Sequence, residues 1–318
     1  GDMFMCSGRP TGAGAHPSTI LQTFRLPEPV KGELEIRFRP TGKEKADTAA
    51  TENTVPEMIM PKNHLAEYVQ YLGNAVPKDT LNVLCVGNSF TYYWGCPAML
   101  KEIAWNEGHY LRVKSTLKGG QTLGDHLALP VSRNVVNAGR YDYAFFQDQS
   151  QSPAKYASDT TQFDYVNTNF LKLTDRLLSR SRNCRVILES TWSFEKDDFG
   201  SFGSHAAFDS LMTIGTSMMV SNASKIFGAN DFEVSPIGRA FSIVRNENPD
   251  IDLYSADSKH QSDYGSYLKA CVNYLMIFRK PFQSQPSEGA TSSIDCGIPH
   301  DQAAYLRQVA ERVVLGAR

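Results

Sequence analysis

Short apolar segments alternate with helical patterns over most of this chain from Leu81 onward. Five segments have the length and the β-branched or aromatic content of buried strands. They are residues 81–87, 111–118, 141–146, 184–191 and 232–237. Three helical patterns lie between them, over residues 96–108, 163–181 and 205–228. Such alternation predicts a parallel sheet covered by helices on both faces, which is a three-layer α/β/α sandwich.

The predicted helix over residues 205–228 carries one stripe of apolar side chains at helical spacing. The stripe consists of Phe208, Leu211, Met212, Gly215, Met218 and Met219. Methionine fills irregular gaps in protein cores, so we interpret the stripe as core packing and not as a cofactor site.

The first 78 residues have a different pattern. Residues 32–40 alternate apolar and charged side chains, which is typical of a half-buried strand, and residues 61–75 have the spacing of a short helix. We therefore predict an N-terminal extension over residues 1–78, packed on a main domain over residues 79–318. A chain of 318 residues suits one large α/β domain with such an extension.

Charge and composition exclude several classes of function. A net charge of -2 offers no field that would attract nucleic acid or an anionic membrane, so we expect neither partner. No apolar run reaches the roughly 18 to 20 residues that a membrane span needs. The six cysteines form no CxxC pair, and no HExxH motif occurs, so we expect no metal and no cofactor.

The first residue, Gly1, leaves open that a signal peptide has been removed. We favour a periplasmic or secreted location over a cytoplasmic one. The sequence leaves the oligomeric state open.

Ser89 lies where the first predicted strand ends, in the run Gly87-Asn88-Ser89-Phe90-Thr91. In open parallel sheets, ligands bind at the carboxyl ends of the strands. The G-x-S-x-G elbow is absent, and no Gly-Lys-Ser/Thr follows the strand. Taken alone, this serine is better interpreted as a turn residue than as a nucleophile.

A second motif lies near the other end of the chain, where Asp257 precedes His260 in an Asp-x-x-His pattern. A serine hydroxyl needs a base that removes its proton, and histidine does this near neutral pH. An aspartate on the same loop can hold the other ring nitrogen. Taken alone, this pair favours an ordinary polar surface loop.

Together, these motifs resemble the GDSL/SGNH hydrolase superfamily over residues 79–318. The resemblance implies a flavodoxin-like fold with a mostly parallel sheet and a serine esterase that needs no cofactor. It implies that Ser89 is the nucleophile, His260 the base and Asp257 its orienting partner. Asn88 stands where the family usually has aspartate, and Gln261 stands where the usual His-Pro-Ser has proline.

The resemblance also implies three donors for an oxyanion hole. Ser89 supplies a backbone N–H, and Gly120 supplies a second one from the Gly119-Gly120 turn. The third block lacks the family's Gly-x-Asn-Asp, but it carries glutamines after the strand. A glutamine amide has the same donors on a longer arm. Gln149 is the first choice for this role, and Gln151 remains the alternative.

Several further side chains are candidates near this edge of the sheet. We predict that Asn88, Tyr92 and Trp192 bind substrate. His126 follows the glycine turn, and we interpret it as a histidine on a helix surface. The expected reaction is cleavage of a small acyl ester, with an acetyl group on a carbohydrate as the expected substrate. The alternatives are a catalytically impaired carbohydrate-binding protein on the same fold, and an amidase or peptidase.

Overall fold

The computed structural model describes residues 79–196, 202–228, 232–283 and 298–316. The predicted strand and helix of the N-terminal extension lie outside the described residues. The extension over residues 1–78 and its packing on the main domain therefore stay predictions.

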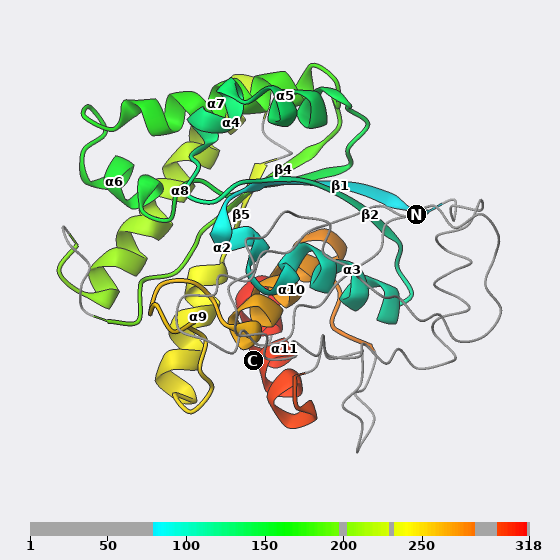
Figure 1. Ribbon diagram of the computed structural model, residues 1–318, viewed down its shortest axis with the longest axis vertical. Helices are drawn as coiled ribbons and strands as arrows, with labels where there is room; N and C mark the ends of the chain where they lie inside the picture. The colour runs from blue at the N-terminus through cyan, green and yellow to red at the C-terminus, as the bar shows by residue number, and fades with distance from the viewer. Residues whose placement is uncertain (1–78, 197–201, 229–231, 284–297, 317–318) are drawn as a thin grey trace, which may run out of the picture. The chain divides into compact units, whose positions relative to one another are not determined.

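A five-stranded, all-parallel sheet forms the centre of the described residues (Figure 1). Its order is β2-β1-β3-β4-β5, the flavodoxin-like order of a doubly wound sheet. The strands are β1 (Leu81–Gly87), β2 (Leu111–Leu117), β3 (Tyr143–Phe146), β4 (Arg185–Glu189) and β5 (Phe232–Ser235). Each of the five predicted strands is confirmed, and so is the α/β fold class.

Helices cover both faces of the sheet (Figure 1). On one face lie α4 (Leu123–Ala128), α5 (Pro130–Asn137) and α7 (Asp164–Leu178); on the other lie α3 (Cys96–Asn106), α9 (Ile237–Glu247), α10 (Asp263–Phe278) and α11 (His300–Leu315). α6 (Ser152–Ser158) and α8 (His205–Phe227) pack against each other. No helix among the described residues is long and apolar enough to span a membrane.

The side chains of β1 explain why both faces need helices. Val83 and Cys85 belong to the core cluster on the side of α10, whereas Leu84 and Val86 belong to the cluster on the side of α7. Successive side chains of a strand point to opposite faces, so a strand that is apolar throughout must be covered twice.

The methionine stripe of α8 packs in the core, as predicted. Phe208, Met212 and Met219 are at most 1% exposed, while Leu211 and Met218 are half-buried. Gly215 brings α8 against α6, since a Cβ atom there would lie 1.9 Å from the carbonyl oxygen of Pro153.

The strand order reverses between the neighbouring strands β1 and β3. The chain moves from β1 to β2 on one side and then returns to β3 on the other. The loops that follow β1 and β3 therefore diverge, and such a switch point is where doubly wound sheets bind ligands.

Candidate active site

Ser89 is the first residue of a very short helix directly after β1. Helix α2 (Ser89–Tyr92) has Asn88 as its N-cap, and the Asn88 side-chain oxygen accepts a hydrogen bond from Phe90 N at 3.0 Å. The helix ends at Tyr92 because the next residue, Tyr93, has a non-helical ψ of 139°; Trp94 (φ 54°) and Gly95 (φ 67°) are then left-handed. A 3₁₀ turn (Tyr93–Gly95) then leads into α3.

The structure brings Ser89, His260 and Asp257 together, although 171 residues separate the serine from the histidine. Ser89 Oγ lies 2.7 Å from His260 Nε2. His260 Nδ1 makes a short hydrogen bond to Asp257 Oδ2. The network assigns the proton of the neutral ring to Nδ1, so that Nε2 accepts from the serine hydroxyl.

Asp257 holds its own loop as well as the ring. Its Oδ1 accepts hydrogen bonds from Lys259 N at 3.1 Å and from His260 N at 3.0 Å. Partial burial raises the pKa of Asp257, but the hydrogen bonds from the His260 ring and from these two backbone groups outweigh it. The pKa of Asp257 therefore lies below its usual value, and the carboxylate is charged at neutral pH.

Aromatic rings fix the plane of the His260 imidazole. Tyr93 stacks on it with ring centroids 4.2 Å apart and an interplanar angle of 15°. Phe90 contacts it at 4.9 Å in a tilted arrangement. Trp192 Nε1 donates to Lys259 O at 3.0 Å, which fixes the backbone beside the histidine. The ring is therefore oriented before any substrate binds.

The loop after β2 lies against the turn that carries Ser89. The side-chain Nδ2 of Asn88 donates to Gln121 O at 2.9 Å, and Gln121 directly follows the Gly119-Gly120 turn. Gly120 is exposed and has φ +72°, a conformation that favours glycine. A Cβ atom on Gly119 would lie 2.9 Å from the Tyr92 hydroxyl, so this half-buried tyrosine borders the turn.

The loop after β3 contains three glutamines, among them the predicted Gln149 and Gln151, and the three differ in environment. Gln147 is fully buried, and its Oε1 accepts from Asn88 N at 2.9 Å and from Thr91 Oγ1 at 3.0 Å. Gln149 is half-buried; its Nε2 donates to Ser150 Oγ at 3.4 Å, and its Oε1 accepts from Gln151 N at 3.0 Å. Gln151 is half-buried at the start of α6. The Gln149 amide is thus held within its own loop.

Asp148 connects the loops that follow β2 and β3. Its Oδ1 accepts from Leu123 N at 3.0 Å and from Gln149 N at 2.7 Å. Burial raises the pKa of Asp148 to about 6, against the opposing effect of these two hydrogen bonds.

Two predicted substrate-binding residues do not reach the surface of the site. Trp192 is fully buried and stacks on Phe241 at 4.1 Å. Asn88 is 2% exposed, and both atoms of its amide are bonded within the protein. In this structure both residues support the site, and their contacts with substrate stay predictions.

His126 is also placed differently from its prediction. It is 1% exposed, with Nε2 2.9 Å from Gly87 O and Nδ1 2.8 Å from Ser132 Oγ. Burial lowers the pKa of His126, which keeps the ring neutral. It holds the last carbonyl of β1, just before Ser89.

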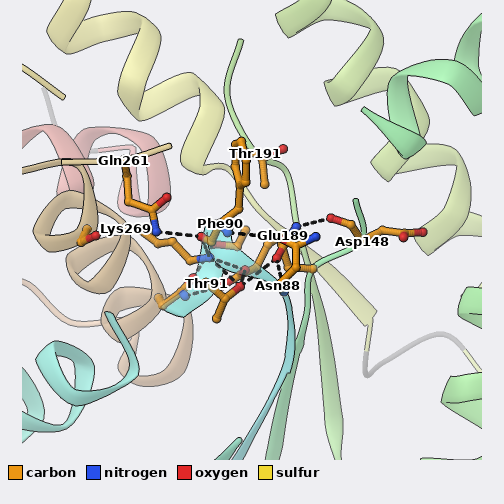
Figure 2. Close-up of polar contacts among 12 residues, drawn as sticks. Asn88, Phe90, Thr91, Asp148, Glu189, Thr191, Gln261 and Lys269 are labelled. Atoms are coloured by element: carbon orange, nitrogen blue, oxygen red, sulfur yellow. Dashed lines mark hydrogen bonds and ion pairs between the residues drawn. The ribbon is translucent and has the colours of Figure 1, made fainter. Parts of the chain in front are cut away.

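A buried ion pair beneath α2 was missed by the sequence reasoning. Lys269 Nζ lies 2.6 Å from Glu189 Oε2, and both side chains are at most 1% exposed (Figure 2). The available signals were a lysine inside the long apolar run of α10 and a glutamate at the end of an apolar strand. Among the described residues, no group of three or more potential metal ligands occurs.

Comparisons with solved structures identify related folds. A DUF4886 family protein from Bacteroides uniformis is 16% identical over 74% of this chain and 95% of its own, with a TM-score of 0.57. This chain shares the fold of that protein. An acetylxylan esterase from Geobacillus stearothermophilus matches 63% of this chain and 95% of its own at 13% identity, with a TM-score of 0.45. A lipase from a goat rumen metagenome matches 62% of this chain and 96% of its own at 14% identity, with a TM-score of 0.42.

No protein-family model and no curated protein matches the sequence. At 16% identity, the similarity to the Bacteroides uniformis protein establishes the fold alone, and the chemistry must be argued from the site itself.

Proposed function

We propose that this chain is a serine hydrolase that cleaves a small acyl ester through Ser89, His260 and Asp257. The observation that carries the proposal is the 2.7 Å contact between Ser89 Oγ and His260 Nε2, on a ring whose Nδ1 is held by Asp257. A nucleophile within hydrogen-bond reach of a base, which a third group orients in turn, is the arrangement that activates a serine.

In the first step, Ser89 Oγ attacks the acyl carbon while its proton moves to His260 Nε2. The imidazolium that forms is stabilised by the Asp257 carboxylate. His260 then gives this proton to the leaving alcohol, and an acyl-Ser89 ester remains.

The negative charge on the carbonyl oxygen needs fixed donors. Ser89 N–H is suited to this role because it lies at the start of α2, where helix N–H groups lack backbone partners. Gly120 N–H is the second proposed donor. Gln149 remains the first choice for the third, and Gln151 the alternative. Because Gln149 Nε2 bonds to Ser150 Oγ at 3.4 Å, its use would require that weak bond to be exchanged for the oxyanion.

In the second step, water replaces the alcohol. His260 Nε2 takes a proton from water as the hydroxyl attacks the acyl carbon, and then returns it to Ser89 Oγ as the acid leaves. The residues named supply each proton transfer of this cycle.

For the substrate, we propose an acetyl group carried on a carbohydrate. Tyr92 is half-buried beside the Gly119-Gly120 turn and supplies an aromatic ring at the site. The fully buried Trp192 does not add to this argument. The loop after β3 is polar, which suits a sugar ester better than a long lipid chain.

One observation favours a second candidate function. The Gln149 amide is bonded within its own loop, and an incomplete oxyanion hole would leave a carbohydrate-binding protein with impaired catalysis on the same fold. The two candidates differ in whether Ser89 reacts.

The test is Ser89-dependent turnover of p-nitrophenyl acetate, together with labelling by a fluorophosphonate probe. Ser89→Ala should abolish labelling and lower kcat by at least about 1,000-fold. Ser190→Ala is a matched control, because Ser190 directly follows β4 at the same edge of the sheet, and it should behave as the wild type. Absence of labelling and of Ser89-dependent turnover in the wild type would reject the hydrolase and favour the binding protein.

Substrate classes are then compared on the active protein. Defined acetylated sugars should be hydrolysed with higher kcat/KM than longer acyl esters or amides. Faster turnover of amides would instead identify an amidase.

A further inference from the structure

The Lys269–Glu189 ion pair lies directly beneath the nucleophile helix. Its two charged atoms are 2.6 Å apart, and the side chains are 0% and 1% exposed. Removal of two charges from water costs several kcal/mol for each ion, so a buried pair is weak evidence of stabilisation. Its contacts indicate what else it does.

All three ammonium protons of Lys269 have acceptors. The acceptors are Glu189 Oε2, Phe90 O at 2.8 Å and Thr91 Oγ1 at 3.1 Å (Figure 2). Glu189 is held in turn by Asn273, which donates to its Oε1 at 2.7 Å. Two of the three contacts of Lys269 are thus made to residues of α2.

The Phe90 carbonyl needs a side-chain donor because α2 is so short. In a continuing helix, the N–H four residues later, at Trp94, would bond to Phe90 O. Tyr93 (ψ 139°) leaves the helical conformation, so the helix ends before this bond. Lys269 takes its place, and a cation is favourable at the carbonyl end of a helix.

The carbonyl oxygen of Phe90 also accepts a hydrogen bond from the loop that carries His260. Gln261 Nε2 donates to Phe90 O at 3.1 Å and to Ser89 O at 3.3 Å, and Gln261 directly follows His260. Gln261 is fully buried. The residue that replaces the family's usual proline therefore joins the histidine loop to the nucleophile helix.

Thr91 extends the network to the loop after β3. Its hydroxyl accepts from Lys269 and donates to Gln147 Oε1 at 3.0 Å, and the same oxygen accepts from Asn88 N. Lys269 is therefore the common partner of the nucleophile turn and, through Thr91, of the glutamine loop.

We propose that Lys269, held in the core by its 2.6 Å contact with Glu189, is a positioning residue that fixes α2 and thereby the Ser89 side chain and N–H against His260. This inference rests on the proposed hydrolase function for its catalytic consequence. Because the Ser89–His260 contact depends on where α2 lies, loss of the lysine should slow the chemical step more than it weakens substrate binding.

The test uses a double variant of the full chain, Glu189→Gln with Lys269→Met. Removal of one partner leaves an uncompensated buried charge, whereas removal of both is often neutral for stability. Gln at position 189 keeps an oxygen for Asn273. The control is Arg185→Gln with Glu233→Gln, which removes a partly exposed ion pair of the same length, 2.6 Å, between β4 and β5, together with the second ion pair that Glu233 makes with Arg279.

Two readouts are compared between the wild type and the two double variants. The first is the separate measurement of kcat and KM. We expect kcat to fall about 10- to 100-fold in Glu189→Gln/Lys269→Met, with KM changed by less than about threefold. The second is hydrogen exchange of the backbone amides of residues 88–93. We expect faster exchange in this variant and no change in the control.

Wild-type kcat together with wild-type exchange in the folded double variant would overturn the inference. A fall in kcat without faster exchange would overturn it too, since the effect would not act through α2. If the wild type shows no Ser89-dependent turnover, the proposed function fails, and hydrogen exchange alone decides whether Lys269 holds α2. If the double variant does not fold, Thr91→Val, which breaks the same network without a change of charge, is judged by the same measurements.

Discussion

At the scale of single residues, the site is held by side chains that do not themselves react. His126 bonds to Gly87 O, Asn88 N is bound by Gln147, and Trp192 fixes the backbone at Lys259. Each side chain makes a hydrogen bond to a backbone group at the end of a strand or in a loop. Side chains from several elements make hydrogen bonds to the polar groups around Ser89. Such a network of buried hydrogen bonds makes a loop rigid.

Asp148 gives a prediction for the pH dependence of stability. The folded protein holds a proton on Asp148 up to about pH 6, whereas the unfolded chain releases it near the ordinary value of 3.8. Between these values the folded state binds more protons, so this contribution to stability is complete below about pH 4 and is lost as the pH rises to 6. Asp148→Asn cannot titrate but keeps the Oδ1 acceptor.

The measurement is urea unfolding of both proteins between pH 4 and 7. We expect the stability of the wild type relative to Asp148→Asn to fall by about 2 kcal/mol over this range. Asp125→Asn is the control: hydrogen bonds from Thr122 lower the pKa of Asp125, so its contribution to stability changes below about pH 4, and its difference from the wild type should stay nearly constant between pH 4 and 7. A pH-independent difference between wild type and Asp148→Asn would contradict the prediction.

At the scale of elements, the close contact between α6 and α8 depends on Gly215. Alanine is the better helix former by about 1 kcal/mol, but its Cβ would lie 1.9 Å from Pro153 O. Because that atom belongs to the backbone, the two helices must separate. We expect Gly215→Ala to lose about 1–3 kcal/mol in urea unfolding. Ser217→Ala, on the exposed side of α8, should change stability little, and a more stable Gly215→Ala would show that the contact relaxes freely.

The strands and the positions of the motifs that contain Ser89 and His260 could be predicted from local sequence pattern, whereas the buried partners of these motifs could not. Apolar runs identified the five strands, and parallel topology brings their carboxyl ends to one edge, so Ser89 could be expected there. Lys269 and Glu189 are 80 residues apart, and the sequence around each of them does not indicate the other as its partner. Trp192 was predicted at the rim of the site because it follows a strand, but its stacking on Phe241 comes from α9.

At the scale of the whole molecule, the surroundings of Ser89 depend on how the helices behind it pack. α11 packs on α9 and α10, and α10 carries Lys269 to the turn that holds Ser89. The connection from the packing of α11 to the site follows only from the three-dimensional order of these elements. The choice between Gln149 and Gln151 stays open for the same kind of reason, because loop geometry and not composition decides which amide faces Ser89.

Leu306 tests whether this whole assembly unfolds as one unit. It is fully buried in α11, and Leu306→Ala should cost about 2–5 kcal/mol through lost burial and a cavity. Because α11 supports α10 and α10 supports α2, we expect the urea midpoints of circular dichroism and of fluorophosphonate labelling at Ser89 to fall together. Arg312→Gln removes only an ion pair with Glu247, whose side chains are 33% and 44% exposed, and should leave both midpoints nearly unchanged. If labelling persisted while the circular dichroism midpoint fell, α11 would unfold separately, and the site would depend on fewer elements than this packing order implies.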